Sequence, residues 1–139
     1  MLSSHEEPAM KVGNIEQEVT FKASPKAVYD LLVDPKKHGA FTESPARIER
    51  KEGGRFSYFG GQLEGFVLRL RANKLIVLAW RSDDWPKDHY SIASFSIART
   101  KDGTKLSFSQ YGVPMSHLED IAQGWETFYW SPMKESLQK

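Results

Sequence analysis

Hydrophobic and polar residues alternate with a period of two in segment 14–23. Val19, Phe21 and Ala23 are apolar, and each is separated from the next by a polar residue. Side chains of a strand point alternately to its two faces, so this alternation predicts a strand with one buried face.

Two helix start signals follow directly. Ser24 and Asp34 are residue types that cap helix N-termini, and each precedes a proline, which suits the first helical turn. Val28, Leu31 and Leu32 then fall on one helical face. The sequence therefore predicts two short helices, the second ending before the next proline, because the residue preceding a proline disfavours helical angles.

The pattern changes to short strands and turns between residues 46 and 112. Apolar runs rich in β-branched and aromatic residues alternate with turn signals at four places: Gly53–Gly54, Gly60–Gly61, Ala72–Lys74 and Asp102–Gly103. This block predicts six strands, which makes seven with the first.

The last segment has the period of an amphipathic helix. Ser116 and Glu119 have the spacing of a capping box. Six residues then form one apolar stripe: Leu118, Ile121, Ala122, Trp125, Phe128 and Tyr129. The pattern predicts a long C-terminal helix with this stripe facing the sheet.

A second apolar stripe, Trp130, Met133 and Leu137, is rotated around the same helix. Pro132 cannot donate a hydrogen bond to the carbonyl of Phe128, so we expect a kink there. The second stripe has two interpretations: it packs against the two short helices, or it is an exposed contact patch.

Composition limits the classes of function. The chain has 139 residues, no cysteine and a net charge of +1. This length suits one domain, and we expect residues 14–139 to form it after a flexible tail at 1–13. The charge balance favours neither nucleic acid nor a membrane as partner, and no segment resembles a membrane span or signal peptide, so we expect a cytoplasmic protein.

The order of elements is that of a helix-grip fold, and four motifs make the match more specific. They are GGRFSYFGG (53–61), EGFVLRLRANKLIVLAW (64–80), YGVP (111–114) and GWETFYWSPMKESL (124–137). Together they resemble the family of the activator of heat-shock-protein-90 ATPase, in its C-terminal domain type, within the START-like, birch-pollen-allergen-like (SRPBCC) superfamily. The resemblance implies an α+β fold, β-α-α-β6-α, in which a curved seven-stranded antiparallel sheet wraps around a long C-terminal helix.

The resemblance also implies functions. Many relatives hold an apolar small molecule between sheet and helix, and the family's two-domain co-chaperones bind a heat-shock-protein-90-type chaperone. We expect a non-catalytic binding module, without cofactor or metal, as a monomer or homodimer. Its first thirteen residues are too few for the N-terminal domain tied to ATPase stimulation, so we do not expect strong activation by this chain alone.

Eight aromatic residues are the candidates for lining such a cavity. Phe56, Tyr58, Phe66, Trp80 and Phe95 would come from the sheet, and Trp125, Phe128 and Tyr129 from the helix. The alternative is that each ring only fills the core, since an apolar stripe usually faces a core. For Tyr58 and Tyr129, the hydroxyl either orients a ligand or reaches solvent or a backbone carbonyl.

An enzyme of the cyclase or hydratase kind, acting on a hydrophobic small molecule in the same cavity, is the alternative function. It requires an acid or base in the cavity wall, and the sequence contains no catalytic motif that supplies one. None of the four histidines, His5, His38, His89 and His117, has a second histidine at metal-ligand spacing, and we expect all four to be exposed. A weak metal site at His89 and the neighbouring aspartates is the alternative for that loop.

Basic residues gather in two segments, and they form a candidate contact rim for an acidic protein. They are Lys36, Lys37, Arg47, Arg50, Lys51 and Arg55. The alternative is a solvated face, because Glu49 and Glu52 lie among them.

Overall fold

The computed structural model describes residues 10–138, and the expectations for residues 1–9, His5 included, lie outside the described residues. The first strand, β1, spans Val12–Phe21. Val12 and Gly13, which we expected in the tail, already pair with Pro114 and Val113. The first strand therefore begins two residues before the expected domain boundary.

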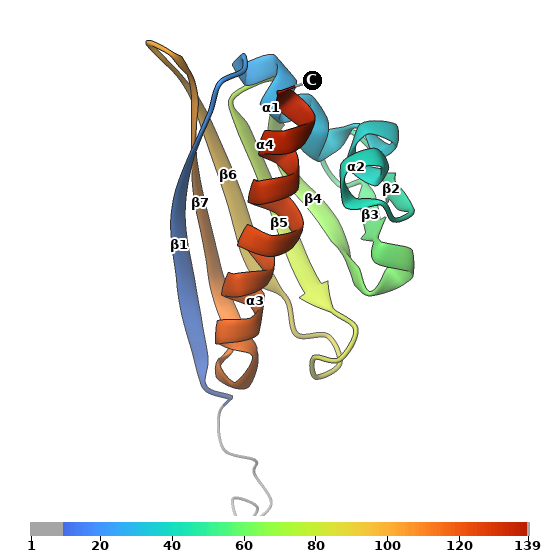
Figure 1. Ribbon diagram of the computed structural model, residues 1–139. Coiled ribbons are helices and arrows are strands. Elements are labelled where there is room, and N and C mark those ends of the chain that lie inside the picture. The colour runs from blue at the N-terminus through green and yellow to red at the C-terminus, as the bar shows by residue number, and fades with distance from the viewer. Residues whose placement is uncertain (1–9, 139) are drawn as a thin grey trace, which may run out of the picture.

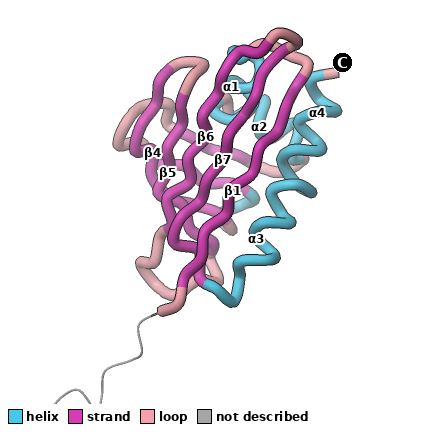
Figure 2. The backbone as a smooth tube through the Cα atoms, turned by 90° about the vertical axis from the view of Figure 1, so that its left-hand side faces the viewer, coloured by secondary structure: helices cyan, strands magenta, loops and turns pink. Residues whose placement is uncertain are grey.

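Seven antiparallel strands form one sheet in the order β1-β7-β6-β5-β4-β3-β2, which confirms the predicted fold class (Figures 1 and 2). After β1, the strands are β2 (Ala46–Ile48), β3 (Arg55–Tyr58), β4 (Leu63–Arg71), β5 (Leu75–Ser82), β6 (Ser91–Thr100) and β7 (Gly103–Pro114). Each predicted turn separates two of these strands. Since β1 pairs with β7, the first strand lies at one edge and β2 at the other.

The helices α1 (Pro25–Val33) and α2 (Pro35–Thr42) begin where their caps predict. The Ser24 hydroxyl accepts a hydrogen bond from the Ala27 N–H at 3.1 Å, and Asp34 Oδ1 accepts from the next two backbone N–H groups. Both caps satisfy donors that a helix start leaves without partners. Figure 1 shows the two helices beside the end of the C-terminal helix.

Two irregularities in the strand pairing accompany the bend of the sheet. The register shifts between Gly13 and Asn14 in β1 and between Val67 and Arg69 in β4. An extra residue in one strand increases local bend and twist. At Gly65 a Cβ would lie 1.7 Å from the carbonyl oxygen of Ala79, so the close approach of backbone there requires glycine.

The C-terminal helix consists of α3 (Leu118–Trp125), a π-helical turn (Glu126–Trp130) and α4 (Ser131–Leu137). The predicted capping box is wrong, because residues 115–117 form a 3₁₀ turn and no side chain caps α3. At Pro132, where we expected a kink, the structure has a π turn directly before the proline, in which the Ser131 N–H donates to the Glu126 carbonyl. Proline has no N–H to donate, and the wider π turn accommodates this missing hydrogen bond. The helix therefore continues from α3 into α4 (Figure 1).

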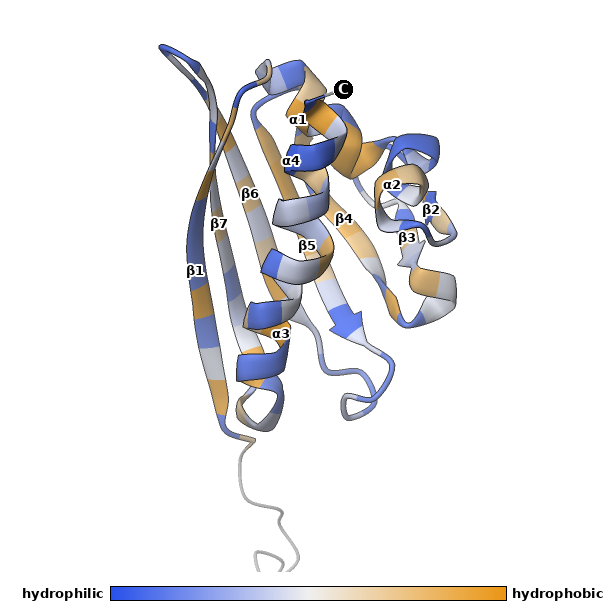
Figure 3. Cartoon of the chain, viewed as in Figure 1, coloured by the Kyte–Doolittle hydropathy of each residue, from blue (hydrophilic) through white to orange (hydrophobic). Residues whose placement is uncertain are grey.

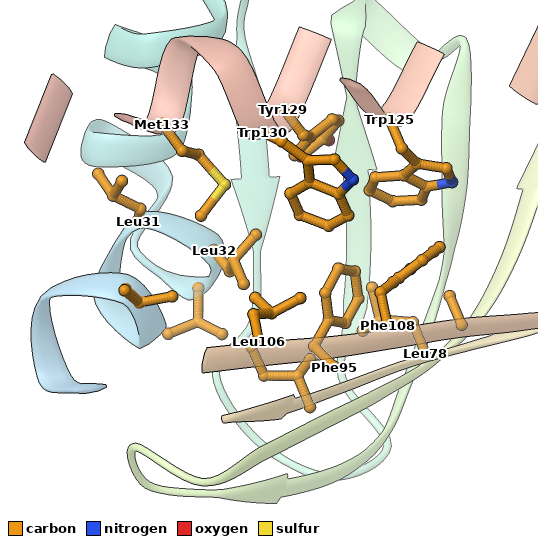
Figure 4. Packing of buried hydrophobic residues seen from close by; sticks show 14 of the residues in the cluster. Leu31, Leu32, Leu78, Phe95, Leu106, Phe108, Trp125, Tyr129, Trp130 and Met133 are labelled. Atoms are coloured by element: carbon orange, nitrogen blue, oxygen red, sulfur yellow. The ribbon is translucent and has the colours of Figure 1, made fainter. Parts of the chain in front are cut away.

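The core lies between the sheet and the C-terminal helix. Trp125, Tyr129, Trp130 and Met133 are all buried, and Figure 4 shows their side chains directed toward α1 and the strands. The second stripe is therefore not an exposed patch. Met133 packs toward α1, as the first interpretation expects, whereas Trp130 lies against Phe108 of β7 and donates a hydrogen bond to Gln17 of β1. Hydrophilic residues occupy the side of this helix that faces away from the sheet (Figure 3). Among the three rings of the C-terminal helix that were expected to line a cavity, Phe128 is the one that is exposed, to 56%.

Candidate functional site

A pocket of about 290 Å³ lies between the C-terminal helix and the strands β4 and β5. Its walls consist mainly of large apolar side chains from both layers. The lining residues are Phe59, Gln62, Leu63, Trp80, Asp120, Ile121, Gly124, Trp125, Phe128 and Tyr129. This volume is at the lower end of the range for small-molecule sites, which lies near 300–1,000 Å³.

Five aromatic rings form the pocket wall. Trp125 lies with its ring centroid 5.8 Å from that of Trp80 and 4.6 Å from that of Tyr129. The exposed Phe128 ring lies 6.2 Å from the Phe59 ring in an edge-to-face arrangement. The buried rings therefore form the inner wall, and Phe128 and Phe59 lie nearer the mouth.

Phe59 reaches this position through an unusual backbone conformation. It has a φ of 55°, and Gly60 and Gly61 follow with φ of 65° and 97°. A bulky residue at positive φ is strained, whereas glycine adopts such angles freely. Three successive positive φ values turn the chain sharply before β4, and this turn supplies one side of the pocket.

Gly124 lines the pocket with its backbone alone, because glycine has no side chain. Glycine within a helix lowers stability by about 0.8–1.0 kcal/mol relative to alanine. A Cβ at this position would meet only Phe128, at an ordinary contact distance of 3.7 Å. No close packing requires glycine here, and its effect is to leave the space of a side chain open inside the pocket.

The polar lining residues, Asp120 and Gln62, are both exposed and lie at the mouth. Among the described residues that line the pocket, none is a lysine, arginine or histidine. The formal charge of the lining is therefore negative and comes from one carboxylate.

Four of the eight candidate residues line this pocket: Trp80, Trp125, Phe128 and Tyr129. Three others, Phe56, Tyr58 and Phe95, are buried in the core beside it. The structure contradicts an inward position for Phe66, whose ring lies on the outer face, 5.9 Å from the Tyr90 ring. The reason is the alternation of β4, in which the neighbours Gly65 and Val67 are buried and Phe66 points the other way.

Sequence reasoning missed Phe59, Leu63 and Ile121 as lining residues. Ile121 belongs to the predicted apolar stripe and could have been selected from it. Phe59 gives no comparable signal, since its position depends on backbone angles that are rare for phenylalanine.

His38 is buried behind the pocket, so the expectation that it is exposed is wrong. Its Nε2 lies 2.9 Å from the Tyr129 hydroxyl, and its ring stacks on the Tyr58 ring at 3.8 Å. Burial lowers the pKa of His38 to about 3, so the ring is neutral at neutral pH. Burial also raises the pKa of Tyr129, which therefore keeps its hydroxyl proton.

The two tyrosine hydroxyls differ in their partners. Tyr58 donates to the carbonyl oxygen of Leu32 at 3.3 Å, as the backbone alternative expected. The Tyr129 hydroxyl contacts His38 instead of solvent or backbone. Both hydroxyls therefore form hydrogen bonds within the protein. Tyr129 lines the pocket with its ring and not with its hydroxyl.

A buried chain of hydrogen bonds holds Trp125 in place. Its Nε1 donates to Gln110 Oε1 at 2.8 Å, and Gln110 Nε2 donates to Ser91 Oγ at 2.9 Å. Ser91 in turn donates to the backbone carbonyl of Trp80 at 2.9 Å. The chain joins the C-terminal helix to β7, β6 and β5, and it satisfies polar groups that are costly to bury alone.

The expected basic rim is divided between two surfaces. Lys26, Lys37 and Arg50 surround the Asp30 carboxylate at 2.6, 3.8 and 3.7 Å. Three exposed cations share one carboxylate, which leaves this basic end positively charged. Arg55 lies apart from it, 5.2 Å from the centre of the Phe66 ring on the outer face.

The loop around His89 does not form the metal site considered for it. His89 Nε2 lies 2.7 Å from the Gly112 carbonyl oxygen, so this nitrogen carries a proton and donates. Across residues 10–138, no three potential ligands are grouped as a metal ion needs. No helix in this part of the chain has the length and apolar character to cross a membrane.

Comparison with known proteins identifies the family that this sequence resembles. The sequence model of the family "Activator of Hsp90 ATPase homolog 1-like protein" matches residues 22–138. The "Activator of 90 kDa heat shock protein ATPase homolog" of Dictyostelium discoideum is 34% identical over 122 residues, which are 86% of this chain and 31% of that protein. The human homolog 1 is 30% identical over 118 residues, 85% of this chain and 35% of that protein.

The fold has a similar counterpart among solved structures. The crystal structure of an HSP90 activator from Plasmodium falciparum superposes with a TM-score of 0.84 at 22% identity. The match covers 90% of this chain and 96% of that one. The chain spans about a third of the length of the two curated relatives above, so what those whole proteins do is not transferred directly.

Proposed function

The chain belongs to the activator of Hsp90 ATPase homolog 1-like family, and from this premise we propose that it is a non-catalytic, co-chaperone-like binding module. Its pocket between the sheet and the C-terminal helix takes an apolar small molecule. The observation that carries this proposal is Gly124, which leaves open a space lined by aromatic rings although a side chain would fit there.

The walls of the pocket are prepared for binding. Trp125 is fixed by its hydrogen bond to Gln110, and Tyr129 by its contact with His38. A ligand would meet rings that are already ordered, so little conformational entropy is lost on binding. Apolar area removed from water contributes about 25 cal/mol per Å², which is the main source of affinity for such a ligand.

Binding is favoured over catalysis by the polar groups of the wall. Asp120 is the carboxylate of the described lining, and it is exposed at the mouth. Tyr129 presents its ring while its hydroxyl stays protonated against His38. A cyclase or hydratase would need a positioned acid or base inside the pocket.

The test uses a variant that fills the pocket. Gly124→Leu places a side chain in the open space, and Glu119→Leu places the same side chain on the helix outside the lining. We expect native mass spectrometry or thermal-shift assays with apolar small molecules to detect a ligand on the natural protein and on Glu119→Leu, but not on Gly124→Leu. Equal binding to Gly124→Leu, or no binding to any of the three proteins, would overturn the proposal.

A second function is contact with an Hsp90-type chaperone, which the names of the relatives support. The specific observation is the basic end, where Lys26, Lys37 and Arg50 share the carboxylate of Asp30. Such a surface attracts an acidic partner, and the attraction weakens as salt screens it.

The chaperone contact is tested by charge reversal. We expect Lys37→Glu with Arg50→Glu to weaken binding to the host's Hsp90-type chaperone at least about tenfold at low salt. Lys11→Glu with Lys87→Glu reverses two exposed cations near the loop between β5 and β6, away from α1, and serves as the control with the same change in net charge. Unchanged affinity in the double variant, or an equal loss in the control, would exclude the basic end as the contact.

A further inference from the structure

We infer that the ligand of the pocket carries an organic cation, of the alkylammonium or quaternary ammonium class, on its apolar body. The inference rests on the proposed pocket and adds the charge of its occupant. Three features support it: the number of aromatic rings, the position of one carboxylate, and the charge of the lining as a whole.

The aromatic rings that line the pocket come from several elements around one small volume. Trp80 comes from β5, Trp125 and Tyr129 from the helix, and Phe59 from the turn before β4. The face of an aromatic ring is negative, and tryptophan is the ring that attracts cations best. An aromatic enclosure is also the arrangement by which proteins recognise quaternary ammonium groups.

The carboxylate of Asp120 gives the mouth of the pocket a negative charge. Asp120 lies one helical turn before Gly124, and both residues line the pocket. The carboxylate is therefore next to the space that Gly124 leaves open. None of the ion pairs found among the described residues engages it. A ligand cation would be the charge that meets it.

The rest of the lining does not oppose a cation. The polar partner at the mouth, Gln62, is neutral, and the described lining contains no basic side chain. An anionic ligand such as a fatty acid carboxylate would face Asp120 without a compensating positive group. The lining thus distinguishes between an amine and an acid of similar shape.

The test compares two molecules of the same shape. Phenyltrimethylammonium is a cation, and tert-butylbenzene replaces its nitrogen by carbon. Binding is followed by the fluorescence of the pocket tryptophans and by ligand-observed NMR. We expect the cation to bind at least about fivefold tighter, the equivalent of about 1 kcal/mol.

Charge is then removed one residue at a time. Asp120→Asn keeps the shape of the side chain, and we expect it to weaken phenyltrimethylammonium about threefold and to leave tert-butylbenzene unchanged. Glu119→Gln removes the same charge from the neighbouring residue, which lies outside the lining. We expect it to change the affinity for either molecule by less than Asp120→Asn changes the affinity for phenyltrimethylammonium.

The outcomes separate this inference from the proposed function. If tert-butylbenzene binds as tightly as the cation, or if Asp120→Asn changes nothing, the pocket binds apolar molecules but the cation preference is wrong. If neither molecule binds the natural protein, the proposed pocket function fails as well.

Discussion

At the scale of single residues, His38 has the strongest link between burial and chemistry. It is enclosed by Phe41, Tyr58 and Tyr129, with ring centroids at 5.1, 3.8 and 5.3 Å. Burial disfavours the charged imidazolium, which is why the pKa of His38 falls to about 3. The neutral His38 ring lies behind the pocket, and its hydrogen bond to the Tyr129 hydroxyl holds the Tyr129 ring in the pocket wall.

This burial predicts a pH-dependent stability. Between pH about 6.5 and 3 the unfolded chain binds a proton at His38 that the folded protein does not bind. The free energy of unfolding therefore falls with acidification through this window, with a contribution of up to about 1.4 kcal/mol per pH unit. Urea unfolding at a series of pH values measures the slope.

His38→Gln is the matched variant for this prediction. Glutamine keeps a polar group near Tyr129 but does not titrate, so we expect a shallower slope below pH 6.5 than in the natural protein. The carboxylates contribute to both slopes and cancel in the comparison. Identical slopes would contradict a buried neutral His38.

At the scale of elements, local signals predicted the helices and strands well. Ser24 and Asp34 cap α1 and α2 because capping depends on residues close in sequence. The C-terminal helix was harder, since Ser116 has the spacing of a cap but lies in a 3₁₀ turn. A kink was expected at Pro132, and the structure has a π turn at Glu126–Trp130 directly before it, which the sequence pattern did not predict.

The pocket could be predicted only in part. Trp125 and Tyr129 follow from the helical stripe, whereas the strand rings required knowledge of which face is concave, and alternation alone does not give it. Phe66 was placed on the wrong face for this reason. His38 was missed because a lone histidine after a helix start gives no sign of the rings that surround it in the fold.

The hydrogen-bond chain between elements predicts energetic coupling. Gln110→Leu leaves the buried Trp125 indole N–H without an acceptor, which costs about 1–3 kcal/mol, and it removes one of the two hydrogen bonds of the Ser91 hydroxyl, which keeps its bond to the Trp80 carbonyl. We expect a loss of about 2–4 kcal/mol in the free energy of unfolding, measured with urea.

A double-mutant cycle with Trp125→Phe separates the hydrogen bond from general damage. With the indole N–H already absent, Gln110→Leu should cost less than in the natural protein, so the double variant is more stable than the sum of the two losses predicts. Strict additivity would show that the two side chains do not depend on each other.

At the scale of the whole molecule, the two proposed binding surfaces share no residue. The pocket lies between β4, β5 and α3, and the basic end lies on α1, α2 and the connection after β2. One domain thus carries the proposed small-molecule site and the charged surface at separate places.

This separation predicts independent effects. Gly124→Leu should abolish binding of the apolar ligand and leave affinity for the chaperone unchanged, while Lys37→Glu with Arg50→Glu should do the reverse. Calorimetry with each partner measures both affinities on the same preparations. If either variant lowers both affinities, the surfaces are coupled or overlap.

The most direct test of the central claim is methyl NMR of the protein titrated with tert-butylbenzene. Leu63 and Ile121 line the pocket, whereas Val28 and Leu106 are buried elsewhere in the core. The account predicts saturable shifts of the Leu63 and Ile121 methyl signals, small changes at Val28 and Leu106, and loss of all shifts in Gly124→Leu. Absence of saturable shifts at Leu63 and Ile121 would contradict it.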